Sequence, residues 1–203
     1  MDPETNKHHE DEPAEERTED GLGILIKNKT LYHGSATTGI NEFTKAEEDT
    51  IGSGIYFTSR AEDAVGYAKR RSRGKKGSSP IIYETVIENL KLVDLRQDDN
   101  AHKILEGFKL LLIKKLEQPG LDYFVKNACR NSIDAIDQNK VGAGNLKEAT
   151  ASHTQLFSDH IRSLGYDGLI ALEGGEGEDI GQHDTYLIFD PEKAKIRKED
   201  KIL

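Results

Sequence analysis

The stretch GSGIYFTSRAEDAVGYAKRR, residues 52–71, carries strand, turn and helix signals around which the rest of the chain can be arranged. Its strand signal is a run of branched and aromatic residues, Ile55, Tyr56 and Phe57. Ser59 followed by Glu62 matches a capping box, which predicts that a helix starts here. Small residues repeat on one face of that helix, at Ala61, Ala64, Val65 and Ala68. The helix is therefore expected to pack closely against a neighbouring element.

The flanking segments read as a strand and two loops. TLYHGS at 30–35 predicts a strand that runs into a glycine turn, and it follows a short apolar stretch at 22–26. Residues 36–54 contain three glycines and few apolar side chains, so we expect a long loop there. Residues 69–77, KRRSRGKKG, carry six basic residues and no acid, which favours a second loop.

Beyond the basic loop, strands and helices follow one another in an irregular order. Two strands come first, at 81–87 and 90–95, with a break expected near Asn89. Three amphipathic helices follow, at 101–112, 124–136 and 149–164. Gly165 is expected to close the third helix. The last two strands are predicted at 167–172 and 186–190. This order favours an α+β fold, in which a mixed sheet has flanking helices and an inserted helical segment.

The charge of the 203 residues is concentrated at one end. The net charge is −9, and residues 1–20 hold nine acids against Lys7 and Arg17, which leaves −2 for the other 183 residues. Those 20 residues contain no Val, Ile, Leu, Phe or Tyr, so they cannot bury enough apolar surface to offset the entropy of ordering. We expect a disordered acidic tail over residues 1–22 and a single domain over residues 23–203.

Cysteine usage and hydropathy narrow the class of protein. Cys129 is the only cysteine, which excludes an internal disulfide and a metal site built from several cysteines. No run approaches about 18 consecutive apolar residues, and the N-terminus is acidic where a signal peptide would be basic and then apolar. We therefore expect neither a transmembrane nor a Sec-secreted protein. The expected location is the cytoplasm, which would be that of a target cell if the protein is delivered as an effector.

Three segments place polar or aromatic groups at the ends of predicted strands, where rigid scaffolds present functional groups. The first, YHGS at 32–35, sets a histidine beside a glycine whose backbone can approach a ligand closely. In the second, Tyr56 and Tyr67 can face one cleft and sandwich a flat heteroaromatic group. The third is DTYLIF at 184–189, which follows an acidic loop rich in glycine. Taken singly, these are also the patterns of a half-buried strand histidine, of core aromatics and of a solvated loop.

Together the segments resemble the ADP-ribosyltransferases of the diphtheria-toxin and poly(ADP-ribose) polymerase type. The motifs of that family stand here as YHGS at 32–35, as GSGIYF at 52–57 with Tyr67 eleven residues after its tyrosine, and as DTYLIF at 184–189. The likeness is greatest to small bacterial and phage domains of effector or polyvalent proteins. Their recurring GIYFT, GYDG and YxxFDP motifs are found here at 54–58, 165–168 and 186–191. The resemblance covers residues 30–197 and implies the split mixed sheet of that fold.

The resemblance also implies a function. It is that of a mono-ADP-ribosyltransferase, which transfers ADP-ribose from NAD to a protein or nucleic acid and releases nicotinamide. His33 would bind the ribose on the nicotinamide side of NAD, and backbone groups of Gly34 would hold the carboxamide. Ser35 is a further expected cofactor-binding residue. Tyr56 and Tyr67 would stack on the nicotinamide ring. NAD is the co-substrate, and the resemblance implies no metal.

Two positions depart from the family pattern. The family's catalytic glutamate precedes the tyrosine of the late strand, where this chain has Thr185, and a serine that often touches the carboxamide is replaced by Ala64. Loss of the glutamate resembles members that transfer single ADP-ribose units or that have lost activity. Asp184 would point to the opposite face of a regular strand unless a bulge re-aimed it, and Glu178 or Asp179 of the loop could take its place. The candidate catalytic residues are His33, Tyr56, Tyr67, Thr185 and Asp184.

Two other functions stay open. Thr185 is also what a catalytically inactive module that binds NAD or ADP-ribose would carry. An RNA 2′-phosphotransferase shares the fold but uses additional histidines and arginines on its strands, and this sequence has no such set.

The acceptor of the transferase would be a macromolecule, and the basic residues 69–76 could meet an acidic protein or a nucleic-acid backbone. No membrane partner is expected, and the oligomeric state is left open.

Overall fold

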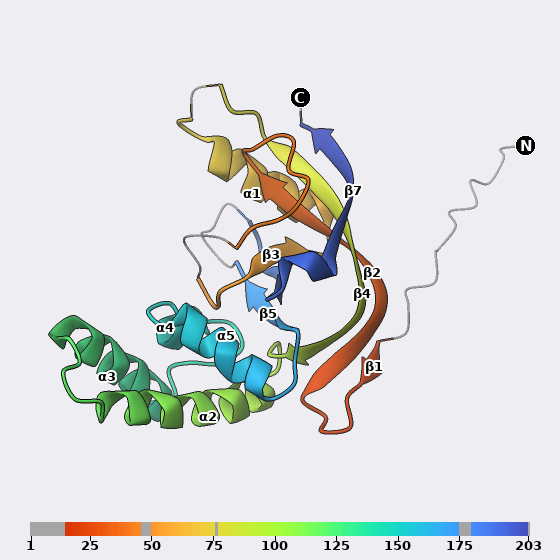
Figure 1. Cartoon of the computed structure of the whole chain (residues 1–203). Coiled ribbons are helices and arrows are strands. Elements are labelled where there is room, and N and C mark those ends of the chain that lie inside the picture. The colour runs from red at the N-terminus through yellow and green to blue at the C-terminus, as the bar shows by residue number, and fades with distance from the viewer. Residues whose placement is uncertain (1–14, 46–49, 76, 175–179, 203) are drawn as a thin grey trace, which may run out of the picture.

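The computed structural model describes residues 15–45, 50–75, 77–174 and 180–202. Its elements in chain order are β1 (Glu16–Arg17), β2 (Gly23–Ser35), β3 (Ile55–Thr58), α1 (Ala61–Ser72), β4 (Ile81–Asp94), α2 (Asp98–Leu116), α3 (Tyr123–Asp137), α4 (Lys147–Thr150), α5 (Thr154–Ser163), β5 (Gly168–Glu173), β6 (His183–Ile188), a 3-10 turn η1 (Pro191–Lys193) and β7 (Ala194–Lys201). In Figure 1, α1 lies against the long curved strands β2 and β4, whereas α2 to α5 gather beside β5.

The described strands form one seven-stranded sheet in the order β1-β2-β3-β6-β5-β4-β7, and β2 also pairs with β4. All pairings are antiparallel except the parallel pair of β4 and β5. Because β2 pairs with both β3 and β4, five strands close into a circuit. Between β2 and β3 the described pairing is limited to Tyr32 and Thr58, so the two strands separate on either side of this point. This is the expected α+β fold with a split mixed sheet, and α2 to α5 are its inserted helical segment.

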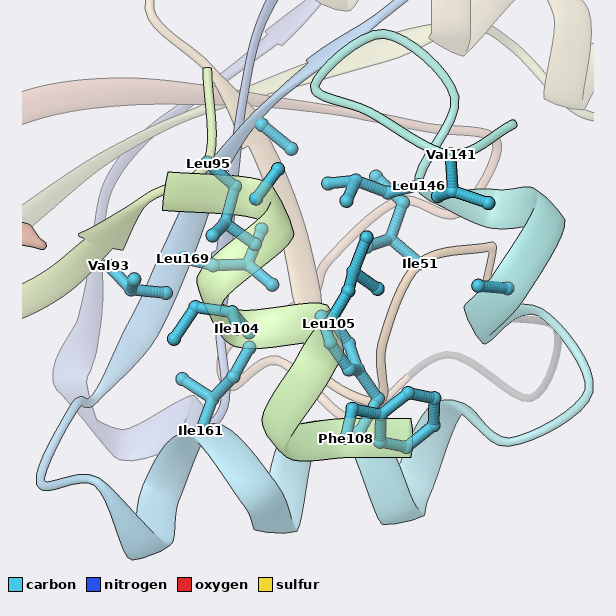
Figure 2. Packing of buried hydrophobic residues seen from close by; sticks show 14 of the residues in the cluster. Ile51, Val93, Leu95, Ile104, Leu105, Phe108, Val141, Leu146, Ile161 and Leu169 are labelled. Atoms are coloured by element: carbon cyan, nitrogen blue, oxygen red, sulfur yellow. The ribbon is translucent and has the colours of Figure 1, made fainter. Parts of the chain in front are cut away.

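Two hydrophobic clusters occupy the two faces of the sheet. The first lies between the sheet and helices α2, α3 and α5, and it includes Leu187 and Phe189. The second lies among the strands and includes Tyr186 and Ile188. This alternation follows from the period of two residues in a strand. Figure 2 shows Ile51 within the first cluster, where it anchors the loop before β3 to the helices.

Several boundaries differ from the sequence predictions. Strand β2 runs unbroken from Gly23 to Ser35, and β4 continues through Asn89, which adopts a left-handed φ of 53°. Asparagine tolerates that conformation better than most residues, so the strand pairs on both sides of it. The basic stretch expected as a loop is helical up to Ser72, and the helix expected at 149–164 is divided into α4 and α5.

The predicted capping box at the start of α1 is wrong. The helix begins after Arg60, whose side chain caps none of the described backbone groups. Strand β3 extends to Thr58, and its hydroxyl donates a hydrogen bond to Asp63 (3.2 Å) and accepts one from the N–H of Arg60 (3.3 Å). Thr58 therefore takes over the anchoring role expected of Ser59.

The N-terminal segment is shorter than the predicted tail. Glu16 and Arg17 pair with Leu25 and Ile24 of β2, so residues 15–22 belong to the folded domain. Residues 1–14 lie outside the described residues. Among the described helices, none is both long and apolar enough to cross a membrane.

Candidate active site

A cavity of about 280 Å³ lies where β2 and β3 separate. Five of the residues predicted from the sequence line it: His33, Gly34, Tyr56, Tyr67 and Thr185. Further lining comes from the loops at 50–51 and 144–147, from Arg70 and Arg71 of α1, and from the end of β5. The structure therefore brings together side chains that the sequence places in three separate segments.

His33 is held in one tautomer at the cavity wall. Its Nδ1 lies 2.8 Å from the backbone oxygen of Tyr56, and because a carbonyl only accepts, Nδ1 carries the proton. Burial, together with the nearby charge of Arg71, lowers the pKa of His33 to about 4. The ring is therefore neutral at pH 7, and its Nε2 is an acceptor. Edge-on contacts with Phe43 and Phe57, at 5.1 and 5.8 Å between ring centroids, fix the ring further.

The Tyr56 hydroxyl organises the loop that borders the cavity. It accepts hydrogen bonds from the N–H groups of Thr50 (3.2 Å), Ile51 (2.9 Å) and Gly52 (3.0 Å), and it donates one to the Gly52 carbonyl (2.7 Å). Burial raises the pKa of this phenol, so the hydroxyl keeps its proton. Tyr56 thus contributes its ring to the cavity and its oxygen to the loop.

Tyr67 is linked to a histidine that the sequence motifs do not mark. The Tyr67 hydroxyl lies 3.1 Å from Nε2 of His183, and the two rings meet edge to face at 5.5 Å. The Arg70 guanidinium lies 4.9 Å above the Tyr67 ring and so occupies one of its faces. The Thr185 hydroxyl is 3.4 Å from the same His183 nitrogen. His183 precedes Thr185 by two residues on β6, so the strand period was the signal that could have identified it.

Gly34 and Ser35, two predicted cofactor-binding residues at the end of β2, differ in their surroundings. A side chain on Gly34 would collide with the backbone of Ala64 and Ala68, so the close packing of α1 against β2 requires glycine here. This confirms the close packing expected from the small residues of the helix. Ser35 does not line the cavity, which corrects the sequence expectation, because its buried hydroxyl accepts a hydrogen bond from the N–H of Thr37 (3.1 Å).

Asp184 also lies outside the cavity lining, which corrects its place among the catalytic candidates. Strand β6 pairs with β5 in regular register through this residue, so no bulge re-aims the side chain. Its carboxylate accepts a hydrogen bond from Arg96 (2.6 Å), and the same guanidinium binds Asp94 through two nitrogens. Glu178 and Asp179, the loop alternatives, lie outside the described residues.

The charged groups at the cavity are mostly basic. Arg70, Arg71 and Lys147 line it, and Glu173 at the end of β5 is the one carboxylate in the described lining. The Thr50 hydroxyl donates a hydrogen bond to Glu173 Oε1 (3.0 Å). Aromatic walls and a basic rim suit a ligand that joins a flat ring to phosphates. No group of three metal-ligating side chains occurs in the described part of the chain.

Comparison with known proteins identifies the family. The sequence model for "ADP-Ribosyltransferase in polyvalent proteins" matches residues 27–201, a range that includes every residue of the site. The chain belongs to this family. The resemblance to ADP-ribosyltransferases of polyvalent proteins, read from the three motifs, is thereby confirmed.

No curated protein matches the chain. Among solved structures, a chain of the M. tuberculosis MbcT–MbcA toxin–antitoxin complex is similar to this chain, with 11% sequence identity and a TM-score of 0.48. The similarity covers 90% of this chain and 88% of that chain.

Proposed function

We propose that this chain is a mono-ADP-ribosyltransferase, which breaks the bond between ribose and nicotinamide in NAD and transfers ADP-ribose to a macromolecular acceptor. The observation that carries the proposal is the convergence of His33, Tyr56 and Tyr67 on one cavity. Membership of the family supports ADP-ribosyl transfer in general. Transfer of single units is supported by Thr185, which stands where polymer-forming members carry glutamate.

Each cavity residue has a role in this proposal. The neutral His33 accepts a hydrogen bond from a ribose hydroxyl through Nε2, since Nδ1 is already bound to a backbone carbonyl. The ring faces of Tyr56 and Tyr67 hold the nicotinamide by stacking. Arg70 and Arg71 attract the pyrophosphate with charge-assisted hydrogen bonds. Together they position the cofactor for cleavage, which is a large part of catalysis for such bonds.

The direct test is incubation of the purified chain with NAD labelled in the nicotinamide and in the adenosine part. We expect release of free nicotinamide and transfer of the adenosine label to a protein or nucleic-acid acceptor. Normal NAD binding without any nicotinamide release, over a panel of acceptors of both kinds, would contradict the proposal.

A second candidate function is that of an inactive module that binds NAD or ADP-ribose and acts through interaction. Two observations favour it: Thr185 carries no charge, and Asp184 is engaged by Arg96. Calorimetry with NAD and with ADP-ribose, run beside the turnover assay, separates the two functions. Tight binding of ADP-ribose with no turnover would identify the module.

The positive charge near the cavity bears on the acceptor, and the single cysteine bears on the cellular compartment. We propose that the basic residues 69–73, at the C-terminal end of α1 and just after it, meet an anionic acceptor. We also propose that the protein acts in a reducing cytoplasm, which is compatible with its single free cysteine, Cys129. Modification of nucleic-acid acceptors should fall steeply between ~50 and ~200 mM salt if phosphates are contacted. Mass spectrometry of a lysate treated with the enzyme and NAD would identify the acceptor.

A further inference from the structure

We infer that Glu173 is the carboxylate that stabilises the reacting ribose in this protein, in place of the glutamate absent at position 185. The inference rests on the proposed transferase function. Glu173 lies outside the family motifs. It is on β5, the strand that pairs with β6, where the glutamate was expected at position 185.

The sheet register places Glu173 on the face that the missing glutamate would occupy. In the pairing of β5 with β6, Ala171 faces Thr185 and Glu173 faces His183. Side chains of paired residues share a face, so Glu173 projects on the same side as Thr185. It is the diagonal neighbour of Thr185, and such neighbours are roughly 7–8 Å apart, which a glutamate side chain can span. Asp184, by contrast, lies on the other face.

Local contacts hold this carboxylate at the cavity. The Thr50 hydroxyl binds Oε1 at 3.0 Å, and the loop that carries Thr50 is fixed by the Tyr56 hydroxyl. In the described part of the chain no protein donor bonds to Oε2, so this oxygen can accept from a ligand. Glu173 also lies close enough for its charge to contribute to the raised pKa of Tyr56. The carboxylate is thus positioned, partly solvated and available on one side.

The chemistry of the bond explains why a carboxylate is needed. When the bond from ribose C1′ to the nicotinamide nitrogen breaks, its electron pair leaves with nicotinamide and neutralises the charged ring. Positive charge then develops on the ribose as an oxocarbenium-like state, which a fixed negative charge stabilises. An acceptor hydroxyl, amine or phosphate oxygen, or water, forms the new bond to C1′, and any proton it carries passes to solvent. In this proposal the Glu173 carboxylate acts through space and forms no covalent bond.

The electrostatic balance of the cavity points to the same residue. Arg70 and Arg71 bring positive charge to the described lining, and this charge suits the pyrophosphate but opposes charge that develops on the ribose. Glu173 is the one described lining residue that can offset it. Removal of its charge should therefore impair the chemical step and leave ground-state binding of NAD largely intact.

The test compares Glu173→Gln, Glu173→Asp and the surface control Glu88→Gln, which lies outside the cavity lining. Nicotinamide release is measured at saturating NAD, and NAD affinity is measured by calorimetry. We expect Glu173→Gln to lower kcat by about 100-fold or more, as loss of a transition-state charge contact does, with Kd changed by less than about 3-fold. Glu173→Asp, which keeps the charge on a shorter side chain, should lose about 10-fold. Glu88→Gln should match the wild type.

The outcomes of this experiment separate the role of Glu173 from the transferase function on which it rests. If the wild type releases nicotinamide and Glu173→Gln keeps kcat within about 3-fold, the role of Glu173 is overturned and the transferase function stands. That role is also overturned if Glu178→Gln or Asp179→Asn abolishes turnover while Glu173→Gln does not. A loss of NAD affinity equal to the loss of kcat would assign Glu173 to binding instead. A wild type that binds NAD without releasing nicotinamide would overturn both.

Discussion

The Tyr67 hydroxyl is the donor in its 3.1 Å hydrogen bond with Nε2 of His183. This direction follows from the other ring nitrogen, because Nδ1 of His183 lies 2.8 Å from the Gly181 carbonyl and must donate to it. With the proton on Nδ1, Nε2 is the acceptor. His183 is buried, so the tyrosine satisfies a nitrogen that solvent reaches poorly. Tyr67 therefore satisfies a buried histidine nitrogen through its oxygen, while its ring lines the cavity, where we propose that it binds NAD.

Variants of Tyr67 should separate these two roles. Tyr67→Phe keeps the ring but removes the donor to His183, so the free energy of unfolding should fall by about 1–3 kcal/mol while NAD affinity changes little. Tyr67→Ala also removes the ring, and NAD affinity should fall several-fold to about tenfold. Urea unfolding and calorimetry measure the two effects. Equal losses of NAD affinity in both variants, with unchanged stability, would show that the hydroxyl contacts the ligand instead.

The low pKa of His33 predicts a specific dependence of stability on pH. The folded-state pKa is about 4 and the ordinary value is 6.5, so between these values the unfolded chain binds the proton more readily. The contribution of His33 is therefore fully present above about pH 6.5 and is lost as pH falls towards 4. Between about pH 7 and pH 4.5 this loss is roughly 2 kcal/mol.

His33→Gln provides the comparison, since glutamine does not titrate. Its free energy of unfolding should fall less steeply than that of the wild type over the same pH range. Glutamine is preferred to alanine because His33 packs against Phe43 and Phe57, and alanine would leave a void there. Parallel pH profiles for the two proteins would refute the lowered pKa of this half-buried histidine.

Charge at the cavity rim should contribute to NAD binding in a salt-dependent manner. Arg71→Gln is expected to weaken NAD binding by about 3- to 10-fold at low salt, and by less at ~200 mM salt, because the side chain is exposed and its charge is screened. Lys114→Gln is the matched control, because this exposed lysine of α2 is outside the cavity lining. An identical effect of the two substitutions would indicate that only overall charge matters.

Two N-terminal deletions should differ in stability. Removal of residues 1–20 deletes β1, the ion pair of Glu15 with Lys29 (3.2 Å) and the hydrogen bonds from the Tyr166 hydroxyl to Asp20 (2.8 Å). A loss of about 1–2 kcal/mol would lower Tm by roughly 2–8 °C for a chain of this size. Removal of residues 1–14 keeps all of these contacts, so Tm should stay near that of the full chain. Equal melting of the two deletions would mean that β1 adds nothing to stability.

Where a motif and a strand end coincide, the sequence indicated several of the residues that line the cavity. Tyr32–Ser35 and Gly52–Phe57 each carry their own local signals, and the cavity lies between the strands that they form. His183 and Glu173 were not identified, because they become part of the site only through the register of β5 with β6. That register is a long-range pairing, which local pattern does not specify.

Other misses have equally physical causes. The alternation of side chains along β6 was enough to place Asp184 on the face opposite Thr185. Its ion-pair partner could not be predicted, because Arg96 is 88 residues away in sequence. Strand β7 was not predicted because it lies at the edge of the sheet and is mostly exposed, so its sequence AKIRKEDK lacks apolar alternation.

The hydrogen bonds of the Tyr56 hydroxyl bear on how this motif should be read in other chains. Its oxygen gathers three successive N–H groups of the loop before β3, and phenylalanine would leave all of them without this acceptor. A related chain without the chemistry would therefore still use this tyrosine to order the same loop. If the proposed role of Glu173 holds, an acid at its place on β5 is a better sign of activity in a related chain than the tyrosine of GIYF, which the loop requires in either case.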